Sequence, residues 1–432
     1  MENKKGREHW GSKIGLILAM AGNAIGLGNF LRFPGKAAGN GGGAFMIPYF
    51  LSLILMAIPL MWLEWAQGRY GGMRGHGTTP GIFQSMWRNP LAKYIGVLGI
   101  FIPTVIVIYY TYIGSWTLGY SIYSLFDFLP KVDQSILKPG MGPKEISDTI
   151  LQPFESFRIA YSGKVNGEFI QIKTFTYIIF IFTLILSVWI LIKGVSRGIE
   201  VLAKIAMPIL FILGVILVIR VFTLGHPVSE HYGSINGFAF LWEPKWYIER
   251  NGKEVFVLFD VQTWLEAAGQ VFFTLSLGMG AIQCYASYLR EDDDVVLSGL
   301  ATTSANEVAE VIMGGSIAIP AAAAFFGVAS AQVIASQGSF CLGFTSMPAI
   351  FGFLPGGNIL GFLWFGLLFL AAITSIVAMA QPMIAFLQDE IGMNREKAAI
   401  ALGVLWFLSS HICIFLRGGW QVMDFWAGTF GP

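Results

Sequence analysis

Charged residues are scarce in this chain. Asp, Glu, Lys and Arg make up 12% of its 432 residues, whereas hydrophobic residues make up 55%. Soluble domains carry about 25% charged residues, so this composition favours a protein embedded in a lipid bilayer. The formal net charge is only +1 and no basic tail is present, which argues against a nucleic-acid partner.

Residues that carry chemistry are equally few. The three cysteines, Cys284, Cys341 and Cys413, are far apart and form no Cys-x-x-Cys or Cys/His metal pattern, so we expect them to be core residues. No phosphate-binding loop or His-Glu-x-x-His motif occurs, and the one Gly-x-Ser-x-Gly match, at 194–198, lies in a short basic turn. The chain is therefore not expected to be an enzyme.

Long apolar runs are what the chain does contain. A helix needs roughly 20 apolar residues to cross about 30 Å of hydrocarbon, and runs of this length recur throughout. A tenth run begins at Asp424, but the sequence stops at Pro432. The nine complete spans that we predict are 14–38, 45–66, 94–125, 174–192, 199–223, 262–289, 296–328, 358–387 and 396–416.

Basic residues near the span ends predict the orientation in the membrane. They gather before the first span, between the second and third, and in the turn between the fourth and fifth, all on one side. We therefore expect a multi-pass protein of the cell membrane with a cytoplasmic N-terminus. The residues concerned are Lys4, Lys5, Arg7, Arg69, Arg74, Arg88, Lys93, Lys193, Arg197 and Lys204.

Two of the predicted spans are interrupted by small and polar residues. The segment 22–34 places three glycines, two asparagines and an arginine in the first span, and Ser-Leu-Gly-Met-Gly at 276–280 interrupts the sixth. Backbone groups freed at such breaks are tolerated in a bilayer only where they line a protected cavity. Half-helix N-termini favour an anionic group and bare carbonyls favour a cation, which suits a carboxylate substrate together with Na⁺.

The two interrupted spans are the first members of two groups of five. Because five is odd, the second group would enter the membrane from the opposite side, which gives an inverted repeat. The predicted fold is an all-α integral membrane protein of five plus five transmembrane helices, with broken first and sixth helices and a tenth that only begins. We expect one transporter domain over 1–432, with repeats at 14–223 and 262–432, the second incomplete at its last helix.

Long runs of the sequence resemble the neurotransmitter:sodium symporter family, in particular its bacterial sodium-coupled amino acid transporters. The resemblance covers essentially all 432 residues. The runs that carry it are 22–34, Asn-Gly-Gly-Gly-Ala-Phe at 40–45, Gln-Val-Phe-Phe-Thr-Leu-Ser-Leu-Gly at 270–278, Ser-Gly-Leu at 298–300 with Asn306 and Glu307, and Asp-Phe-Trp-Ala-Gly at 424–428.

The resemblance implies two bound sodium ions. The first would be held by the carbonyl of Ala24, the side chains of Asn29, Thr274 and Asn306, and the carboxylate of the substrate. These are all oxygen ligands, as a hard cation requires. Without the resemblance, a lone Asn in a membrane helix is equally well explained by a hydrogen bond between helices.

The second ion would be held by the carbonyls of Gly22, Ile25 and Ala371 and the hydroxyls of Thr374 and Ser375. The last three residues share one face of the eighth span, since they are three and four positions apart. On spacing alone, Ser and Thr in a membrane helix are better explained by bonds to their own backbone. The match to the family reverses that preference.

A substrate pocket between the two breaks is also implied. Amides after the first break and a tyrosine hydroxyl would hold the carboxylate, and carbonyls at both breaks would take the ammonium group. Gly26 stands where family members that move amines without a carboxylate have an aspartate, so an α-amino acid is expected. The implied pocket residues are Asn23, Ala24, Leu27, Gly28, Ile106, Tyr110, Phe273, Thr274, Ser276, Met279, Ser375 and Met379.

Charged and aromatic residues at both ends of this pocket would act as gates. Arg32 and Asp424 would form an outer ion pair above a lid of two pocket aromatics. On the cytoplasmic side, Arg7, Trp10 and Asp389 would close the pathway. A charge at a membrane boundary is most often merely solvated, but Arg32 lies inside the matching run.

Glu310 lies one helical turn after Asn306 and therefore on the same helix face. In the resemblance, chloride-dependent members have a serine here and bind Cl⁻ beside the first sodium site, whereas members with glutamate supply the negative charge themselves. We therefore expect that chloride is not required. The alternative for Glu310 is a membrane acid paired with a neighbouring donor.

The leading hypothesis is a symporter that uses the Na⁺ gradient to accumulate a neutral, apolar α-amino acid by alternating access. The alternative is a non-transporting amino acid binding or sensing protein on the same scaffold; a channel is disfavoured because the motifs form an occluded site with two gates. Family members usually have eleven or twelve spans, so the sequence is either a fragment or a short form. Met279 and Met379 are adaptable side chains, which leaves the identity of the amino acid open.

Overall fold

The computed structural model describes residues 8–163, 172–250, 252–416 and 418–430. Helices make up most of this part of the chain, and its one sheet is an antiparallel hairpin of β1 (Tyr247–Arg250) and β2 (Lys253–Phe256). The prediction of an all-α membrane protein is confirmed. The hairpin, which lies between the fifth and sixth predicted spans, was not predicted.

The helices differ widely in length, from single turns to α20, which has 33 residues. They are α1 (Lys13–Ala24), α2 (Leu27–Gly39), α3 (Met46–Ser52), α4 (Ile58–Gly72), α5 (Thr79–Met86), α6 (Leu91–Gly96), α7 (Leu98–Leu125), α8 (Pro143–Ile146), α9 (Gln152–Tyr161), α10 (Thr174–Ile192), α11 (Glu200–Phe222), α12 (Ser234–Trp242), α13 (Val261–Leu275), α14 (Ala281–Ala286), α15 (Val295–Glu307), α16 (Gly315–Phe326), α17 (Val328–Ser336), α18 (Ser339–Cys341), α19 (Met347–Gly352), α20 (Gly357–Asp389), α21 (Arg395–Phe415) and α22 (Gly419–Met423). Wider, π-helical turns follow or join several of them, at Leu53–Ala57, Ser147–Leu151, Val195–Ile199, Val308–Gly314, Leu342–Ser346 and Asp424–Phe430. Two short 3₁₀ turns lie at Gln134–Ile136 and Val257–Phe259.

The membrane spans agree with the apolar runs in the sequence. Within the described ranges, seven continuous helices are long and apolar enough to cross a membrane, and the bent pair α1 and α2 would be an eighth. The predicted span at 262–289 is not among them because its break divides it into α13 and the short α14. The seven are Met46–Gly72, Leu91–Leu125, Thr174–Ile192, Val195–Phe222, Val295–Phe326, Gly357–Asp389 and Arg395–Phe415.

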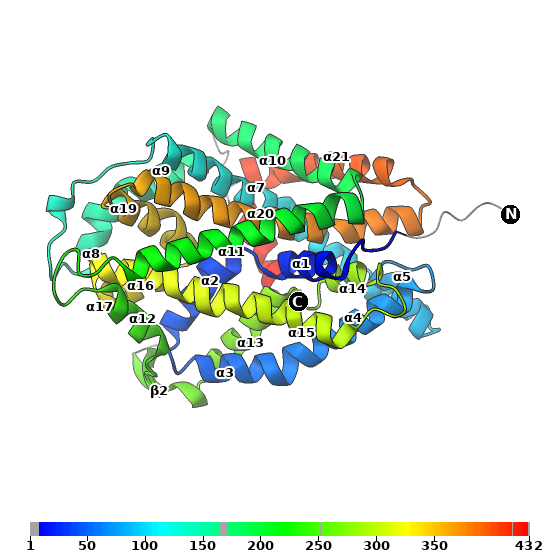
Figure 1. The fold of residues 1–432 in the computed structure, drawn as a ribbon, viewed down its shortest axis with the longest axis horizontal. Coiled ribbons are helices and arrows are strands. Elements are labelled where there is room, and N and C mark those ends of the chain that lie inside the picture. Colours follow the sequence, from blue (N-terminus) through cyan, green and yellow to red (C-terminus); the bar gives the residue numbers. More distant parts are fainter. Residues whose placement is uncertain (1–7, 164–171, 251, 417, 431–432) are drawn as a thin grey trace.

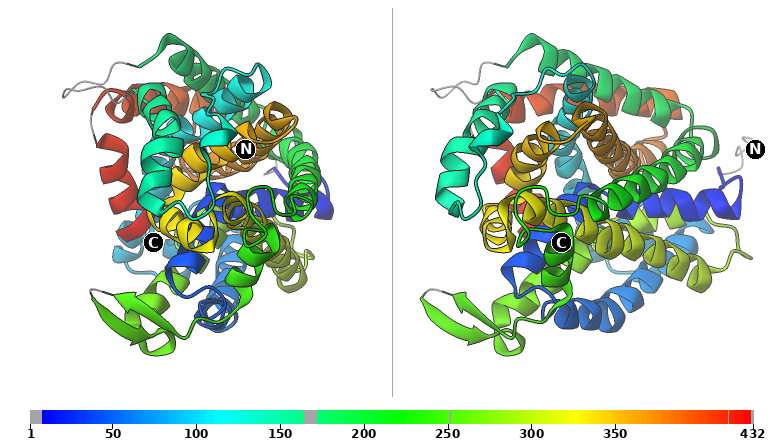
Figure 2. Two further views of the ribbon diagram at one scale, coloured as in Figure 1. Left: turned by 90° about the vertical axis from the view of Figure 1, so that its left-hand side faces the viewer. Right: turned by 60° about the vertical axis from the view of Figure 1, so that its left-hand side comes forward.

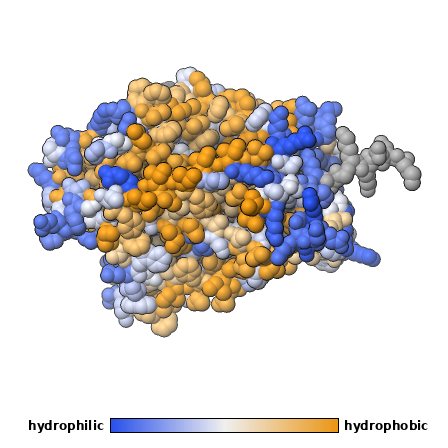
Figure 3. Space-filling view, in the orientation of Figure 1, coloured by the Kyte–Doolittle hydropathy of each residue, from blue (hydrophilic) through white to orange (hydrophobic). Residues whose placement is uncertain are grey.

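Most long helices run along the longest axis of the molecule, as Figure 1 shows. In space-filling view, apolar side chains cover the middle of the visible face and polar ones gather at its two ends (Figure 3). Such an apolar band is expected of a protein whose middle section is surrounded by the hydrocarbon core of a bilayer. The β-hairpin projects sideways near one of the polar ends (Figure 2).

The first break lies between α1 and α2, inside the predicted segment. Ile25 and Gly26 have extended backbone angles, and the axes of the two helices differ by 49°. Gly26 allows a close approach here, because an added Cβ would lie 2.9 Å from the Tyr110 hydroxyl and 3.2 Å from Ser375 Oγ. The two halves meet at the centre of the bundle, where α1 packs against α11, α15 and α20.

The second break lies between α13 and α14. Ser276 has φ +56°, and Gly278 and Gly280 both have φ +76°. Left-handed angles of this kind cost little for glycine but more for other residues, so the Gly-x-Gly spacing suits the interruption of the helix. Gly280 is also a point of close contact, because an added Cβ there would lie 2.1 Å from the carbonyl oxygen of Gly99.

We predict that Gly280→Ala destabilises the protein by about 2 kcal/mol or more, because it combines a left-handed angle with a steric overlap. The measurement is the thermal unfolding midpoint of the purified protein in detergent. Gly269→Ala in α13 is the matched control, since an added Cβ there meets no atom within 4 Å, and it should leave the midpoint unchanged or slightly raised. Equal midpoints for the two variants would contradict this account of the break.

Candidate functional site

A buried polar cluster lies beside the first break, around Asn29 in the first turn of α2. Its Oδ1 accepts a hydrogen bond from the amide of Gly26 at 2.8 Å. Its Nδ2 lies 2.9 Å from Thr274 Oγ1 on α13, Asn306 Oδ1 on α15 and a carboxylate oxygen of Glu310. All four side chains are at most 2% exposed. Three residues predicted as ligands of the first sodium ion are therefore brought together from three helices.

Glu310 is fully buried in the π-helical segment Val308–Gly314. Its partners are neutral donors, because it accepts hydrogen bonds from Gln270 Nε2 at 2.8 Å, from Asn29 and from the hydroxyl of Thr274. Hydrogen bonds to a charged acceptor are about twice as strong as those between neutral groups. A carboxylate in this cluster therefore places negative charge directly beside Asn29, Thr274 and Asn306.

A second group of oxygens surrounds Ser375 on α20. Its hydroxyl lies 3.2 Å from the carbonyl oxygen of Gly22, 3.3 Å from that of Ile25 and 3.1 Å from that of Ala371. The neighbouring Thr374 hydroxyl lies 3.1 Å from the Ala371 carbonyl oxygen. One hydroxyl has one proton, so it cannot satisfy three carbonyls together. This surplus of acceptors suits a hard cation bound by oxygen ligands.

A small cavity lies between the two oxygen groups. About 30 Å³ of it is open to water-sized molecules, roughly the volume of one water in the liquid, so side chains must move apart to admit anything larger. Of the predicted pocket residues only Leu27 does not line it, and the amide of Leu27 donates to the Tyr110 hydroxyl at 3.0 Å. The lining residues are Asn23, Ala24, Gly26, Gly28, Asn29, Ile106, Tyr110, Phe273, Thr274, Ser276, Met279, Ser375 and Met379.

Glu64 on α4 is a structural partner of the site that the sequence reasoning missed. One carboxylate oxygen accepts from the amide of Gly278 at 2.8 Å, inside the second break, and the other is buried without a hydrogen-bond partner in the described structure. An acid within an otherwise apolar span is the signal that could have identified it, because such residues are rarely placed in a membrane without a purpose.

The outer end of the site differs from the predicted ion pair. The guanidinium of Arg32 lies over the Phe273 ring, 4.4 Å from its centroid, while Asp424 accepts from the hydroxyl of Tyr109 at 2.7 Å. No contact within 4 Å joins Arg32 to Asp424 among the described ion pairs. Each charge is held by an aromatic neighbour instead, which gives a cation–π contact on one side and a hydrogen bond on the other.

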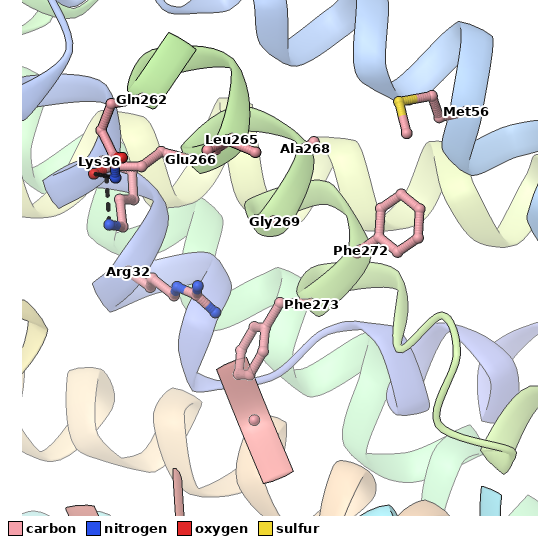
Figure 4. A pocket seen from close by; sticks show the side chains of 11 residues that line it. Arg32, Lys36, Met56, Gln262, Leu265, Glu266, Ala268, Gly269, Phe272 and Phe273 are labelled. Atoms are coloured by element: carbon pink, nitrogen blue, oxygen red, sulfur yellow. Dashed lines mark hydrogen bonds and ion pairs between the residues drawn. The ribbon is translucent and has the colours of Figure 1, made fainter. Parts of the chain in front are cut away.

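Arg32 and Phe273 line a larger cavity of about 470 Å³ at this end of the molecule. Figure 4 shows both side chains between α2 and α13, with the ion pair of Lys36 and Glu266 on the same wall. The nitrogen and oxygen of that pair are 3.1 Å apart. Phe273 lines both cavities, so its ring separates the small inner cavity from the larger outer one.

The opposite end of the site is closed by contacts of the N-terminal segment. Trp10 Nε1 donates to the carbonyl of Tyr285 at 3.0 Å, and its ring packs edge-on against the Tyr285 ring. Asp389, at the end of α20, accepts from the amide of Gly77 at 2.7 Å. Arg7 lies outside the described residues, so its part in closing this side stays a prediction.

Two broken helices that enclose a cavity between closed ends of a membrane-spanning bundle define a secondary transporter. A model of the sodium:neurotransmitter symporter family matches residues 7–430, and the chain belongs to this family. It is therefore a multi-pass membrane transporter of a sodium-dependent class and not an enzyme.

Individual relatives agree with this assignment. An uncharacterised sodium-dependent transporter of Methanocaldococcus jannaschii is 29% identical over 94% of this chain and 75% of its own length. YhdH of Bacillus subtilis, also described as an uncharacterised sodium-dependent transporter, is 30% identical over 98% and 81%. The sodium-dependent nutrient amino acid transporter 1 of Drosophila erecta is 26% identical over 98% and 69%.

A solved structure is similar over nearly the whole chain. MhsT in complex with L-phenylalanine is 29% identical and gives a TM-score of 0.77, with 99% of this chain and 87% of that chain covered. The fold described above is therefore shared with a protein whose structure contains a bound amino acid.

We predict that replacing Thr374 and Ser375 together by alanine weakens Na⁺ binding about tenfold or more, because a desolvated cation loses two oxygen ligands. The measurement is the Na⁺ concentration that half-maximally raises the unfolding temperature. Thr111→Ala is the control: this buried hydroxyl donates to the Val107 carbonyl of its own helix at 2.7 Å and should not affect Na⁺ binding. An unaltered Na⁺ dependence in a folded double variant would exclude the site.

Proposed function

We propose that this protein is a sodium-coupled symporter of neutral, apolar α-amino acids that works by alternating access. The observation that carries the proposal is the position of the cavity. It lies between the two breaks and shares Asn29, Thr274 and Ser375 with the two oxygen groups described above. A ligand there would touch the same residues as the cations, so binding of the two would be coupled.

The polar wall of the cavity suits an amino acid backbone. The amides of Leu27 and Gly28 belong to the N-terminus of α2, where the helix dipole favours a negative charge, and with the Tyr110 hydroxyl they would hold the carboxylate. The ammonium group would be taken by the Ser276 hydroxyl and by carbonyls at both breaks. Those carbonyls belong to Ala24, Phe273 and Thr274.

The remaining wall of the cavity is apolar. Ile106, Phe273, Met279 and Met379 would contact the side chain of the substrate, and none of them can pair with a charged one. Gly26 brings no acid to the wall, which favours a substrate that carries its own carboxylate over a simple amine. The L-phenylalanine complex of MhsT supports an apolar amino acid, and the two methionines can adapt to more than one.

Two Na⁺ ions would accompany the substrate. The first would lie among Ala24, Asn29, Thr274 and Asn306 and be completed by the substrate carboxylate. The second would lie between α1 and α20, at the carbonyls around Ser375. The negative charge of Glu310 beside the first ion would replace chloride, since an unbalanced charge in a low-dielectric setting costs several kcal/mol.

Access would alternate between the two ends of the bundle. The N-terminus would be cytoplasmic, as the basic residues predict, so that Trp10 and Asp389 close the inner side. Phe273, Arg32 and Asp424 would close the outer side, with the last two approaching as the outer end tightens. The two predicted repeats, 14–223 and 262–432, would supply the halves that move relative to each other.

Uptake in proteoliposomes tests this proposal directly. With an inward Na⁺ gradient, the protein should accumulate radiolabelled L-phenylalanine or another apolar amino acid above its external concentration, and dissipation of the gradient with a sodium ionophore should release it. Liposomes without protein are the control. Sodium-dependent binding without accumulation would contradict symport and favour the alternative, a binding or sensing protein.

We predict that the wild-type protein takes up substrate equally fast in chloride and gluconate salts. In gluconate, the uptake rate of Glu310→Ser should be at least about tenfold lower than that of the wild type, and chloride should restore most of it. The reason is that a serine can bind Cl⁻ but cannot supply a charge itself. Glu266→Gln, at the outer acid paired with Lys36, is the control and should show no chloride dependence. A wild type that needs chloride, or a serine variant with equal uptake in both salts, would remove Glu310 from the mechanism.

A further inference from the structure

Glu200, the first residue of α11, forms a buried junction with the N-terminal end of α1. Its side chain is nearly inaccessible to solvent, and its carboxylate accepts hydrogen bonds from the amide of Gly11 at 2.6 Å and from Ser12 Oγ at 2.8 Å. Lys204, one turn further along α11, pairs with it at 2.7 Å. The carboxylate is therefore fully engaged, and two of its partners belong to the start of another helix.

The sequence leaves room for this carboxylate by placing glycines four residues apart. An added Cβ at Gly15 would lie 2.1 Å from Glu200 Oε1, and one at Gly11 would lie 3.1 Å from Oε2. Gly11 precedes the N-cap of α1 and Gly15 lies in its first turn, so both glycines leave space for the acid at the start of the helix. Even an alanine at Gly15 would displace the Glu200 side chain from its present position.

Ser12 joins this contact to the folding of α1 itself. It is the N-cap of the helix, and its hydroxyl accepts from the amide of Gly15 at 3.1 Å while donating to Glu200. One hydroxyl thus both caps α1 and ties that cap to α11. Ser12 therefore fixes the N-terminal end of α1 relative to α11, in addition to the packing between the sides of the two helices.

The position of this end matters because α1 carries site residues at its other end. It has 12 residues and is therefore about 18 Å long. Gly22, Asn23 and Ala24 form its last turn, at the cavity and the second oxygen group. Beyond them the chain is extended at Ile25 and Gly26, so the helical hydrogen bonding of α1 does not continue into α2, as a hinge between the two helices requires.

We propose that Glu200 is a positioning residue that holds α1 closed against α11, and that its hydrogen bonds to Gly11 and Ser12 break when the N-terminal side of the transporter opens. This inference rests on the proposed alternating access. A movement that carries the start of α1 away from α11 must break these bonds, because Glu200 is bonded to Gly11 and Ser12. The acid therefore sets how often the inner side is open.

A cysteine reporter on α1 tests this without measuring transport. Ala19 is 3% exposed and lies four residues after Gly15, on the same face. Ala19→Cys is introduced after the three native cysteines have been replaced by alanine, and its rate of reaction with a small maleimide is measured in detergent with Na⁺. This Ala19→Cys protein is the parent of the variants below, and it should react slowly. Glu200→Gln should react about tenfold faster and Ser12→Ala about threefold faster, because bonds to a charged acceptor are lost.

Glu266→Gln is the matched control, because Glu266 accepts from Asn40 at 2.8 Å and pairs with Lys36 at 3.1 Å at the opposite end of the molecule. Its reporter rate should equal that of the parent. An unchanged rate in folded Glu200→Gln, or an equal rise in Glu266→Gln, would overturn the proposal. If Glu200→Gln does not fold, the Ser12→Ala rate decides: a rise supports the proposal, and an unchanged rate overturns it.

The uptake of the cysteine-reporter parent separates this inference from the proposed function. If the parent accumulates amino acid and Glu200→Gln leaves the reporter rate unchanged, only the proposed role of Glu200 is refuted. A wild-type protein that accumulates none would refute symport, whereas a faster reaction in Glu200→Gln would still establish that Glu200 holds α1 in place.

Discussion

The constraint on which this structure depends is that backbone amides and carbonyls cannot be left unpaired in the interior of a membrane protein. Two helices are broken at the centre of the bundle, and each break frees such groups. Side chains from neighbouring helices satisfy many of them. The pairs are Gly26 N–H with Asn29, Leu27 N–H with Tyr110, Gly278 N–H with Glu64, the Asn23 carbonyl with Ser276, and the Gly22 and Ile25 carbonyls with Ser375.

After this pairing, several oxygen atoms at the breaks still have too few hydrogen-bond donors, and these are available to ligands. Ser375 offers a single proton to three carbonyls, and Asn29 offers its amide group to three oxygens. Oxygens gathered in this way repel one another unless a cation lies among them. The same breaks that would destabilise an ordinary membrane helix would thus create the proposed ion sites, and a substrate in the cavity between them would complete the first.

The sequence alone predicts the framework well, for physical reasons. Apolar runs identify the spans because a bilayer requires them, and glycines identify the breaks. At the second break, Gly278 and Gly280 have left-handed angles that few other residues tolerate. At the first break, Gly26 leaves space for Tyr110 and Ser375. The helix termini at the first break, Ala24 and Leu27, lie within the predicted segment. These are local properties, so periodicity and composition are enough to find them.

Contacts between distant segments were not accessible in the same way. The cluster of Asn29, Thr274, Asn306 and Glu310 was found only through the family resemblance, because it joins three helices far apart in sequence. The expected contact of Arg32 with Asp424 is absent: Arg32 contacts Phe273 and Asp424 contacts Tyr109 instead. Side-chain packing determines these partners. Glu200 was missed altogether, although glycines at 11 and 15 were a visible sign of close packing.

The central claim is that the substrate carboxylate and Na⁺ are bound together at the broken helices. The most direct test compares L-phenylalanine with phenethylamine, which lacks only the carboxylate, by isothermal titration calorimetry in Na⁺ and in K⁺. The account predicts that the amino acid binds at least about tenfold more tightly in Na⁺ and that the amine shows no such dependence. Equal Na⁺ dependence for the two ligands, or none for the amino acid, would contradict it.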